Sequence, residues 1–248
     1  MSRSLPSLIE AGLAELGTPG RAAQEKRYLK SELDHFGASL PATRRLVGQT
    51  VAERPGVGHD ELVEAVDVLW ARGIHDCRTA AVELLRARAD ALGPDDLDLV
   101  ERLVRGSSTW ALVDPLAEHV AGDLVTRYPG LVETLDRWSG DDDFWIRRSA
   151  MLALLRPLRQ GAGDFDRFGG YADRMLDERE FFIRKAIGWI LRDTSRRRPD
   201  LVYAWLAPRA ARCSGVTIRE AVKHLSADQR AAILDLRARP GAVGRPDA

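Results

Sequence analysis

Cysteine is scarce in this chain: its 248 residues include only two, Cys77 and Cys213, and no CxxC pattern. A disulfide framework or a cysteine-ligated zinc site is therefore not expected. The five histidines are scattered, and no set of His, Cys, Asp and Glu residues has the spacing typical of metal ligands. The sequence predicts no metal site.

Long apolar stretches and cofactor motifs are missing as well. Charged residues interrupt every apolar run well short of the ~18 residues that a membrane span requires, and residues 1–16 lack the apolar core of a secretory signal. There is no GxGxxG, P-loop or GxSxG motif, which disfavours nucleotide cofactors and serine-hydrolase chemistry. We expect a cytoplasmic protein that contacts no membrane and binds no nucleotide cofactor.

Helix-forming sequence is what the chain has in abundance. Ala, Leu, Arg and Glu dominate, and apolar residues recur at three- and four-residue spacing, as between Leu62 and Trp70. Strand-like alternation is nearly absent. Breakers rich in Pro and Gly cut the chain into predicted helices of roughly 10–18 residues. They lie at residues 18–20, 55–58, 93–94, 106–108, 128–130, 161–163 and 198–199. The sequence predicts an all-α protein.

An internal repeat is visible within this helical pattern. Similar segments begin at Cys77, Ile146, Ile183 and Ile218, and the last three starts lie 37 and 35 residues apart. A period of this length without strands predicts stacked helix pairs, that is, a HEAT-like helical-repeat solenoid (an α-α superhelix) with a concave face. We expect one such domain over residues 1–236 and a flexible tail over residues 237–248.

The repeat register places one residue of each repeat at an equivalent position, in a column along one side of the stack. These residues are Thr79, Asp114, Arg148, Lys185 and Glu220. Two interpretations are open at this point. The column lines a functional face, or equivalent positions merely carry surface charge.

Trp110 and Asp114 are four residues apart and would share one face of a helix. A carboxylate beside an indole ring suits a cation, because the charge attracts it and the ring adds a cation–π interaction. The alternative is structural. Asp114 precedes Pro115, and Asp at the N-cap with Pro at the first helical position is a common helix start.

Further clusters combine aromatic and basic residues. Residues 180–192 place Phe182, Ala186 and Trp189 at helical spacing, and Gly188 in mid-helix indicates close approach of another group. The basic residues of this segment would ordinarily form a solvated face. Similar clusters are residues 144–148, residues 219–224, and Tyr28 together with residues 41–45.

Taken together, these motifs resemble the DNA alkylation repair (AlkD-like) DNA glycosylases. The resemblance runs in order from about residue 20 to residue 226 and rests on four strings, with weaker matches at Tyr28 and residues 41–45. The strings are Trp110-x-x-Val-Asp114, Trp145-Ile-Arg-Arg148, Glu180-Phe-Phe-Ile-Arg-Lys-Ala-Ile-Gly-Trp189-x-Leu-Arg192 and Arg219-Glu-Ala-Val-Lys223-His224. The family's fold is a HEAT-like helical solenoid, in agreement with the repeat period.

The resemblance implies a DNA glycosylase that excises cationic N3- and N7-alkylated purines from duplex DNA by hydrolysing the N-glycosidic bond. Family members use no metal or cofactor, cradle the duplex in the concave surface, and do not need to flip the lesion into a pocket, as most glycosylases do. Bulky adducts are therefore tolerated in principle. Contact along the whole stack suggests a monomer.

Residue roles carry over position by position. Asp114 matches the catalytic carboxylate, and Trp110 and Trp189 match two aromatics that line the deoxyribose at the lesion. The remaining matches are to residues near the lesion or the DNA backbone: Tyr28, Arg148 and Arg192, and, as phosphate contacts, Arg44, Arg45, Lys185, Arg219 and Lys223.

The chain departs from the family pattern at two positions beside the catalytic carboxylate. Ala111 stands where many members carry Asp, and Pro115 stands where a small polar residue is common. These changes bear on substrate range, and they leave open a specialised role in self-resistance to a DNA-alkylating natural product. The alternatives to an enzyme are a non-catalytic HEAT-repeat scaffold that binds DNA or protein, and a purely structural interaction module.

The net charge of zero conceals an asymmetry. The chain has 37 Lys and Arg against 37 Asp and Glu, which argues against a nucleic-acid-binding protein when taken as a sum. Residues 1–143 hold 16 basic and 25 acidic side chains, a net charge of −9, whereas residues 144–248 hold 21 and 12, a net charge of +9. The C-terminal half therefore has the electrostatics of a surface that faces DNA.

Overall fold

The computed structural model describes residues 4–238, and over these residues it is helical without a β-strand. One isolated parallel bridge joins Asp34 to Ile74. No helix within the described residues is long and apolar enough to cross a membrane. The predicted all-α class is confirmed. The described residues fall into two compact units that meet between Leu124 and Val125, and each unit is described by itself.

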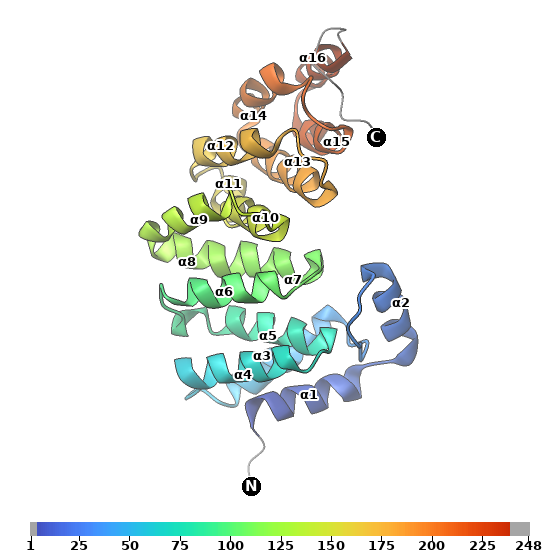
Figure 1. Ribbon diagram of the computed structural model, residues 1–248, viewed down its shortest axis with the longest axis vertical. Coiled ribbons are helices and arrows are strands. Elements are labelled where there is room, and N and C mark those ends of the chain that lie inside the picture. The colour runs from blue at the N-terminus through green and yellow to red at the C-terminus, as the bar shows by residue number, and fades with distance from the viewer. Residues whose placement is uncertain (1–3, 239–248) are drawn as a thin grey trace. The chain divides into compact units, whose positions relative to one another are not determined.

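The first unit consists of successive helices stacked side by side, of which α3 and α4 both pack on α5 (Figure 1). Its helices are α1 (Leu5–Leu16), α2 (Pro19–Leu29), α3 (Leu40–Ala52), α4 (His59–Ala71), α5 (His75–Ala87), η1 (Ala89–Ala91), α6 (Asp96–Arg105), α7 (Trp110–Pro115), the π-helix η2 (Leu116–Ala121) and the first part of α8 (Gly122–Arg127). Helix α2 differs from the other α-helices of this unit because none of its residues is buried.

The second unit is organised around α13, which packs against α10, α11, α14 and α15. Its helices after α8 are η3 (Pro129–Leu131), α9 (Val132–Trp138), α10 (Phe144–Leu152), α11 (Leu155–Arg159), α12 (Phe165–Met175), α13 (Phe181–Ser195), α14 (Pro199–Leu206), η4 (Ala207–Arg209), α15 (Gly215–Ala221), η5 (Val222–His224) and α16 (Ala227–Ala238). The predicted tail starts at Arg237, but Arg237 and Ala238 belong to α16. Residues 239–248 lie outside the described part of the chain.

The predicted breakers fall between helices or in the first turn of a helix. Pro199 opens α14, and Gly106 ends α6. The predicted repeat also appears in the packing, because the side chains that begin each repeat are fully or almost fully buried. These are Cys77, Ile146, Ile183 and Ile218, in α5, α10, α13 and α15, and Leu112 of α7, one period after Cys77, is buried as well. Repetition of one buried position at the predicted period confirms a HEAT-like helical-repeat fold.

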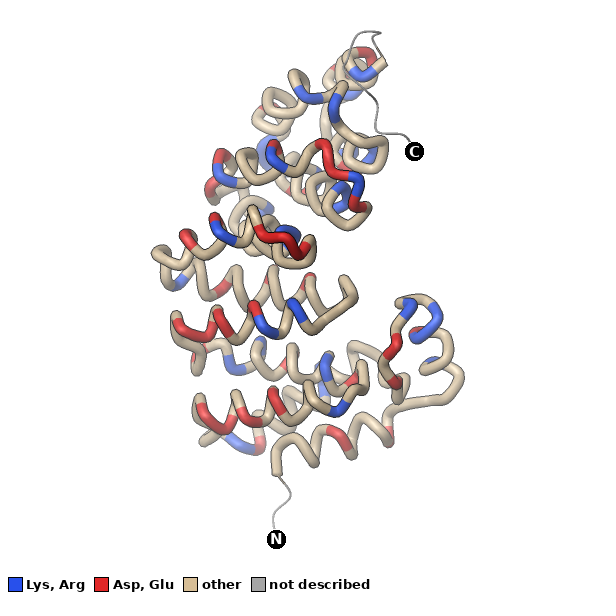
Figure 2. The backbone as a smooth tube through the Cα atoms, in the orientation of Figure 1, with Lys and Arg blue, Asp and Glu red and all other residues tan. Residues whose placement is uncertain are grey.

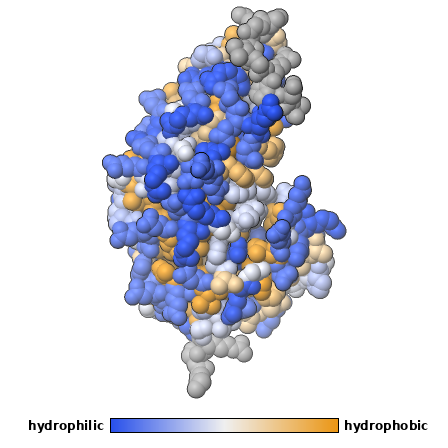
Figure 3. Space-filling view, in the orientation of Figure 1, coloured by the Kyte–Doolittle hydropathy of each residue, from blue (hydrophilic) through white to orange (hydrophobic). Residues whose placement is uncertain are grey.

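Ion pairs between consecutive repeats have the same period as the sequence repeat. Arg102 pairs with Asp67 at 2.7 Å and Arg212 with Asp177 at 2.6 Å, in each case 35 residues apart along the chain. Arg209 contacts Asp173, 36 residues before it. Basic and acidic residues accordingly lie side by side in both units (Figure 2). Mostly hydrophilic residues cover the face shown in Figure 3, with apolar residues in smaller patches between them.

Candidate DNA-repair site

Helix α7 carries both residues of the predicted Trp110–Asp114 pair. Thr109 caps this helix, because its backbone is extended and its Oγ1 accepts the N–H of Ala111 at 3.4 Å. Asp114 is thus inside α7, and the alternative in which Asp114 is itself the N-cap is wrong. Four residues apart on one helix, Trp110 and Asp114 lie on the same face.

Pro115 lies inside this helical segment and starts no helix. It has no N–H to donate to the carbonyl of Ala111, and its ring crowds that carbonyl. The chain nevertheless continues directly into η2, a π-helix of six residues, and then into α8. Short π-helical turns recur at functional sites. The backbone directly after Asp114 and Pro115 is therefore π-helical.

Two exposed aromatic side chains meet beside Asp114's helix. Trp110 is 37% exposed and Tyr28, on α2, is 72% exposed. Their ring centroids are 6.2 Å apart and their planes meet at 88°, so the rings contact edge to face. Both rings border a pocket of about 230 Å³ that Ala111, Glu25 and other residues of the first unit also line. The structure therefore brings together Tyr28 and Trp110, two residues predicted to belong to one site. Asp114 is half-buried and lies one helical turn from Trp110 along α7.

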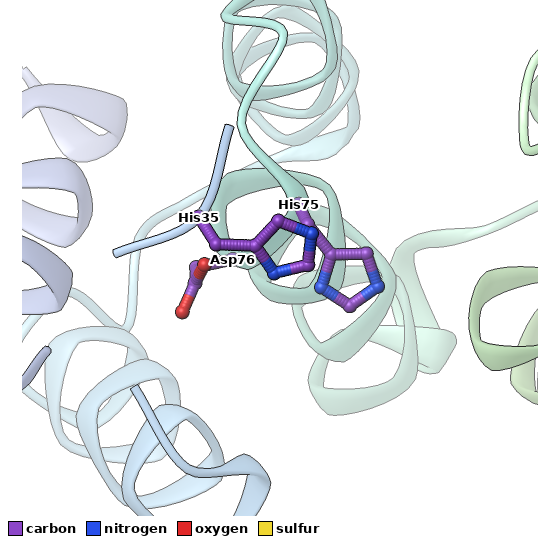
Figure 4. A group of neighbouring side chains, drawn as sticks. All are labelled: His35, His75 and Asp76. Atoms are coloured by element: carbon purple, nitrogen blue, oxygen red, sulfur yellow. The ribbon is translucent and has the colours of Figure 1, made fainter. Parts of the chain in front are cut away.

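His75 and Asp76 line the same pocket and His35 stacks on His75, although the sequence predicted no metal-ligating set. His35 and His75 stack with centroids 4.7 Å apart and ring planes 9° from parallel (Figure 4). The carboxyl oxygens of Asp76 accept the backbone N–H groups of Phe36 at 2.9 Å and Ala38 at 2.7 Å. One ligand atom of each of His35, His75 and Asp76 lies within 4.8 Å of the others. Burial lowers the pKa of His75 to about 4 and also lowers that of His35, so both rings are neutral at pH 7.

The basic pair on α3 is exposed, but its two side chains have different neighbours. The Nε of Arg44 lies 3.2 Å from a carboxyl oxygen of Glu83, on α5, so this carboxylate positions the guanidinium. Arg45 borders a hollow of about 240 Å³ that residues of α1 also line. Both residues remain predicted phosphate contacts.

Gly188 allows α13 and α15 to approach each other closely in the second unit. A Cβ at Gly188 would lie 2.9 Å from the Cβ of Glu220 and 3.0 Å from the carbonyl oxygen of Thr217. The predicted close approach is therefore confirmed, and its cause is helix packing. Glu180 starts α13 by accepting the N–H of Phe182 at 3.1 Å.

This close packing buries Glu220 among three cationic side chains. Its carboxylate accepts hydrogen bonds from the Nζ of Lys185 at 2.8 Å, the Nζ of Lys223 at 3.0 Å and the Nη1 of Arg192. Burial alone would raise the pKa of Glu220, but the hydrogen bonds from both lysines and the nearby charge of Arg192 lower it to about 2. One buried carboxylate thus holds three of the predicted DNA-contacting residues together, in what we call the Glu220 cluster.

A second buried carboxylate, Asp193, holds Trp189. The indole Nε1 of Trp189 donates to Asp193 at 3.1 Å, and Asp193 also accepts from the Nε of Arg192 at 3.1 Å and the Nε of Arg159 at 2.9 Å. Arg192 therefore links Asp193 to Glu220. Sequence reasoning assigned no role to Asp193, although its position four residues after Trp189 is a helical-neighbour signal.

The other two predicted contacts of the second unit differ in exposure. Arg148 is only 2% exposed; its Nη1 donates to the carbonyl of Phe182, and its guanidinium lies 6.0 Å from the Phe182 ring centroid. Its packing role between α10 and α13 was not predicted. Glu220, at the equivalent position of another repeat, is 8% exposed. The interpretation that these equivalent positions merely carry surface charge is therefore wrong for Arg148 and Glu220. Arg219, on α15, is exposed.

Several solved structures are similar to this chain. A predicted DNA alkylation repair enzyme from Enterococcus faecalis has a TM-score of 0.76 at 22% identity, covering 85% of this chain and 97% of the other. AlkD2 from Streptococcus mutans has a TM-score of 0.60 at 16% identity, with coverages of 83% and 98%. A further S. mutans protein has a TM-score of 0.52 at 15% identity, with coverages of 88% and 96%. At these identities the structures establish the fold alone.

Family comparison is more specific than structural similarity. No curated protein matches the chain. The model of the DNA alkylation repair enzyme family, however, matches residues 9–225, which include every predicted site residue. The chain therefore belongs to the DNA alkylation repair enzyme family.

Proposed function

We propose that this protein is a DNA glycosylase that releases cationic N3- and N7-alkylated purines from duplex DNA by hydrolysing the N-glycosidic bond. The observation that carries the proposal is the arrangement on α7, where Asp114 lies one helical turn from the exposed indole of Trp110, with Tyr28 edge-on against it. Membership of the DNA alkylation repair family supports it.

The proposed reaction suits this set of groups. An alkylated purine is already a cationic leaving group, so no general acid is required. As the bond breaks, positive charge moves onto the deoxyribose, which becomes oxocarbenium-like. A carboxylate stabilises such a charge electrostatically, as carboxylates do in glycoside hydrolysis, and π faces add cation–π attraction. We assign the carboxylate role to Asp114, which also orients the attacking water, and a π face to Trp110. The family resemblance implies the same role for Trp189.

Duplex DNA is the proposed partner, bound through its phosphates. The exposed Arg219 and the Glu220 cluster supply positive charge in the second unit, and Arg44 and Arg45 supply it in the first. Buried carboxylates hold Lys185, Arg192 and Lys223, which limits the side-chain entropy that these cations lose when a phosphate binds. We further propose that the lesion is excised without being flipped into a pocket, as the family resemblance implies.

The test is base release by the purified protein from a duplex oligonucleotide that carries one 7-methylguanine, with the free base detected by chromatography. Wild-type protein should release the base, and Asp114→Asn should bind the same duplex and release little. Asp123→Asn is a matched control, because Asp123 is also half-buried and follows in the same continuous helical segment. Absence of release by the wild type would leave a non-catalytic DNA-binding scaffold as the better description.

A further inference from the structure

Three buried imidazole nitrogens in the first unit have no hydrogen-bond partner among the described residues. They are Nδ1 and Nε2 of His35 and Nε2 of His75. Burial of an unpaired polar atom is costly, and such groups usually indicate a water, an ion or another ligand that completes their bonding. The side chain of His35 is 1% exposed, and His75 is 8% exposed, so bulk solvent does not explain them.

The donors around these nitrogens are those of a transition-metal site. The carboxylate of Asp76 completes a group whose ligand atoms lie within 4.8 Å of one another. Its two oxygens accept backbone N–H bonds, which orient the carboxylate and leave lone pairs for a further partner. A carboxyl oxygen of Glu25 lies 4.0 Å from the Nδ1 of His35 and is within reach as a fourth ligand. Imidazole nitrogen with carboxylate oxygen is the donor set that zinc and similar divalent ions prefer.

We propose that His35, His75 and Asp76 bind a divalent transition-metal ion of the zinc type. A ligated ion lies in the plane of each imidazole that binds it. Because the two rings are stacked within 9° of parallel, one of them turns about its Cβ–Cγ bond when the ion binds. The ion enters from the 230 Å³ pocket, whose lining includes Glu25, His75 and Asp76.

Such an ion would act as a structural clamp for α2. No residue of α2 is buried, whereas Gly37 and Ala38 are buried in the segment that follows it, residues 31–39. In that segment Gly37 has φ 82° and lies so close to α2 that a Cβ would be 2.5 Å from the backbone N of Ala22. An ion bound by His35 on one side and by α5 residues on the other would reinforce the hydrogen bonds from Phe36 and Ala38 to Asp76, which already join this segment to α5. It would thereby fix the position of Tyr28, which α2 carries.

The experiment uses full-length protein without an affinity tag, treated with a chelator, dialysed and titrated with Zn²⁺ by calorimetry. We expect binding of one Zn²⁺ per chain, and a loss of affinity of at least about tenfold in His35→Phe and in His75→Phe. Phenylalanine removes the ligand atoms together with the unpaired nitrogens, and it preserves an aromatic stack, so both variants should fold. His59→Phe is the control, because His59 is a more exposed histidine that contacts the carboxylates of Asp60 and Asp96.

Hydrogen exchange gives a second readout that does not depend on enzymatic activity. Zn²⁺ should slow amide exchange in residues 31–38 of the wild type and of His59→Phe, and should leave exchange in His35→Phe unchanged. The proposal is overturned if the wild type binds no Zn²⁺, or if both Phe variants bind it as the wild type does. In either case water, and not a metal ion, completes the bonding of these nitrogens.

Discussion

Replacement of Glu220 by Gln should destabilise the second unit and remove a specific pH dependence. Glu220 is 8% exposed and is hydrogen-bonded by Lys185, Lys223 and Arg192. Its pKa falls from an ordinary value of 4.5 to about 2 in the folded protein. The difference corresponds to a contribution of about 3 kcal/mol to the free energy of unfolding at pH 7, at about 1.4 kcal/mol per unit of pKa.

The sign of the pH dependence follows from this depressed pKa. As pH falls below 4.5, the unfolded chain binds a proton at Glu220 before the folded chain does, so the contribution is complete above pH 4.5 and declines toward pH 2. At pH 3 about 2 kcal/mol of it should be gone. Because Gln does not titrate, the difference between wild type and Glu220→Gln should shrink by that amount between pH 7 and pH 3.

Urea unfolding followed by circular dichroism at both pH values measures this difference. Asp177→Asn is a suitable control, since Asp177 is paired with Arg212 at 2.6 Å but its side chain is 67% exposed. Surface ion pairs contribute about 0–1 kcal/mol, so this variant should change stability little. A Glu220→Gln variant as stable as wild type at pH 7, or a difference that does not change with pH, would refute the account of the Glu220 cluster.

Two further predictions concern packing and DNA binding. Gly188→Ala should lower the stability by about 1–3 kcal/mol, because its Cβ would lie within 3.0 Å of α15. Gly170→Ala, on α12, where a Cβ would meet no atom of a neighbouring element within 4 Å, should raise it by up to about 1 kcal/mol in thermal unfolding. Arg219→Gln should reduce the slope of log affinity against log salt for duplex DNA by about 1, whereas Arg230→Gln on α16 should leave it unchanged. Equal slopes for the two variants would exclude Arg219 as a phosphate contact.

Helix class and helix ends are predictable from this sequence because their causes are local. Proline fits the first turn of a helix and glycine the end of one, as at Pro199 and Gly106, so breakers mark boundaries without tertiary information. The repeat period also predicts that residues about 35 apart meet, and Lys185 contacts Glu220 at that separation. Gly188 could be recognised for the same reason, because a mid-helix glycine is costly without close packing.

The features that were mispredicted or missed depend on tertiary contacts. Asp114 before Pro115 has the local pattern of a helix start, yet Thr109 starts the helix earlier and a π-helix continues it beyond the proline. His35 and His75 are 40 residues apart, and no motif spacing connects them. Burial of Arg148 depends on α13 packing over α10, which charge patterning does not reveal.

We propose Asp114 as the catalytic carboxylate of a DNA-alkylpurine glycosylase, and this role can be measured directly. The most direct measurement is single-turnover release of 7-methylguanine from duplex DNA by wild type, Asp114→Asn and Asp123→Asn, with duplex affinity measured in parallel. Wild type and Asp123→Asn should release the base, and Asp114→Asn should release it at least about 100-fold more slowly with unchanged duplex affinity. Equal release by Asp114→Asn and the wild type would show that Asp114 is not the catalytic carboxylate.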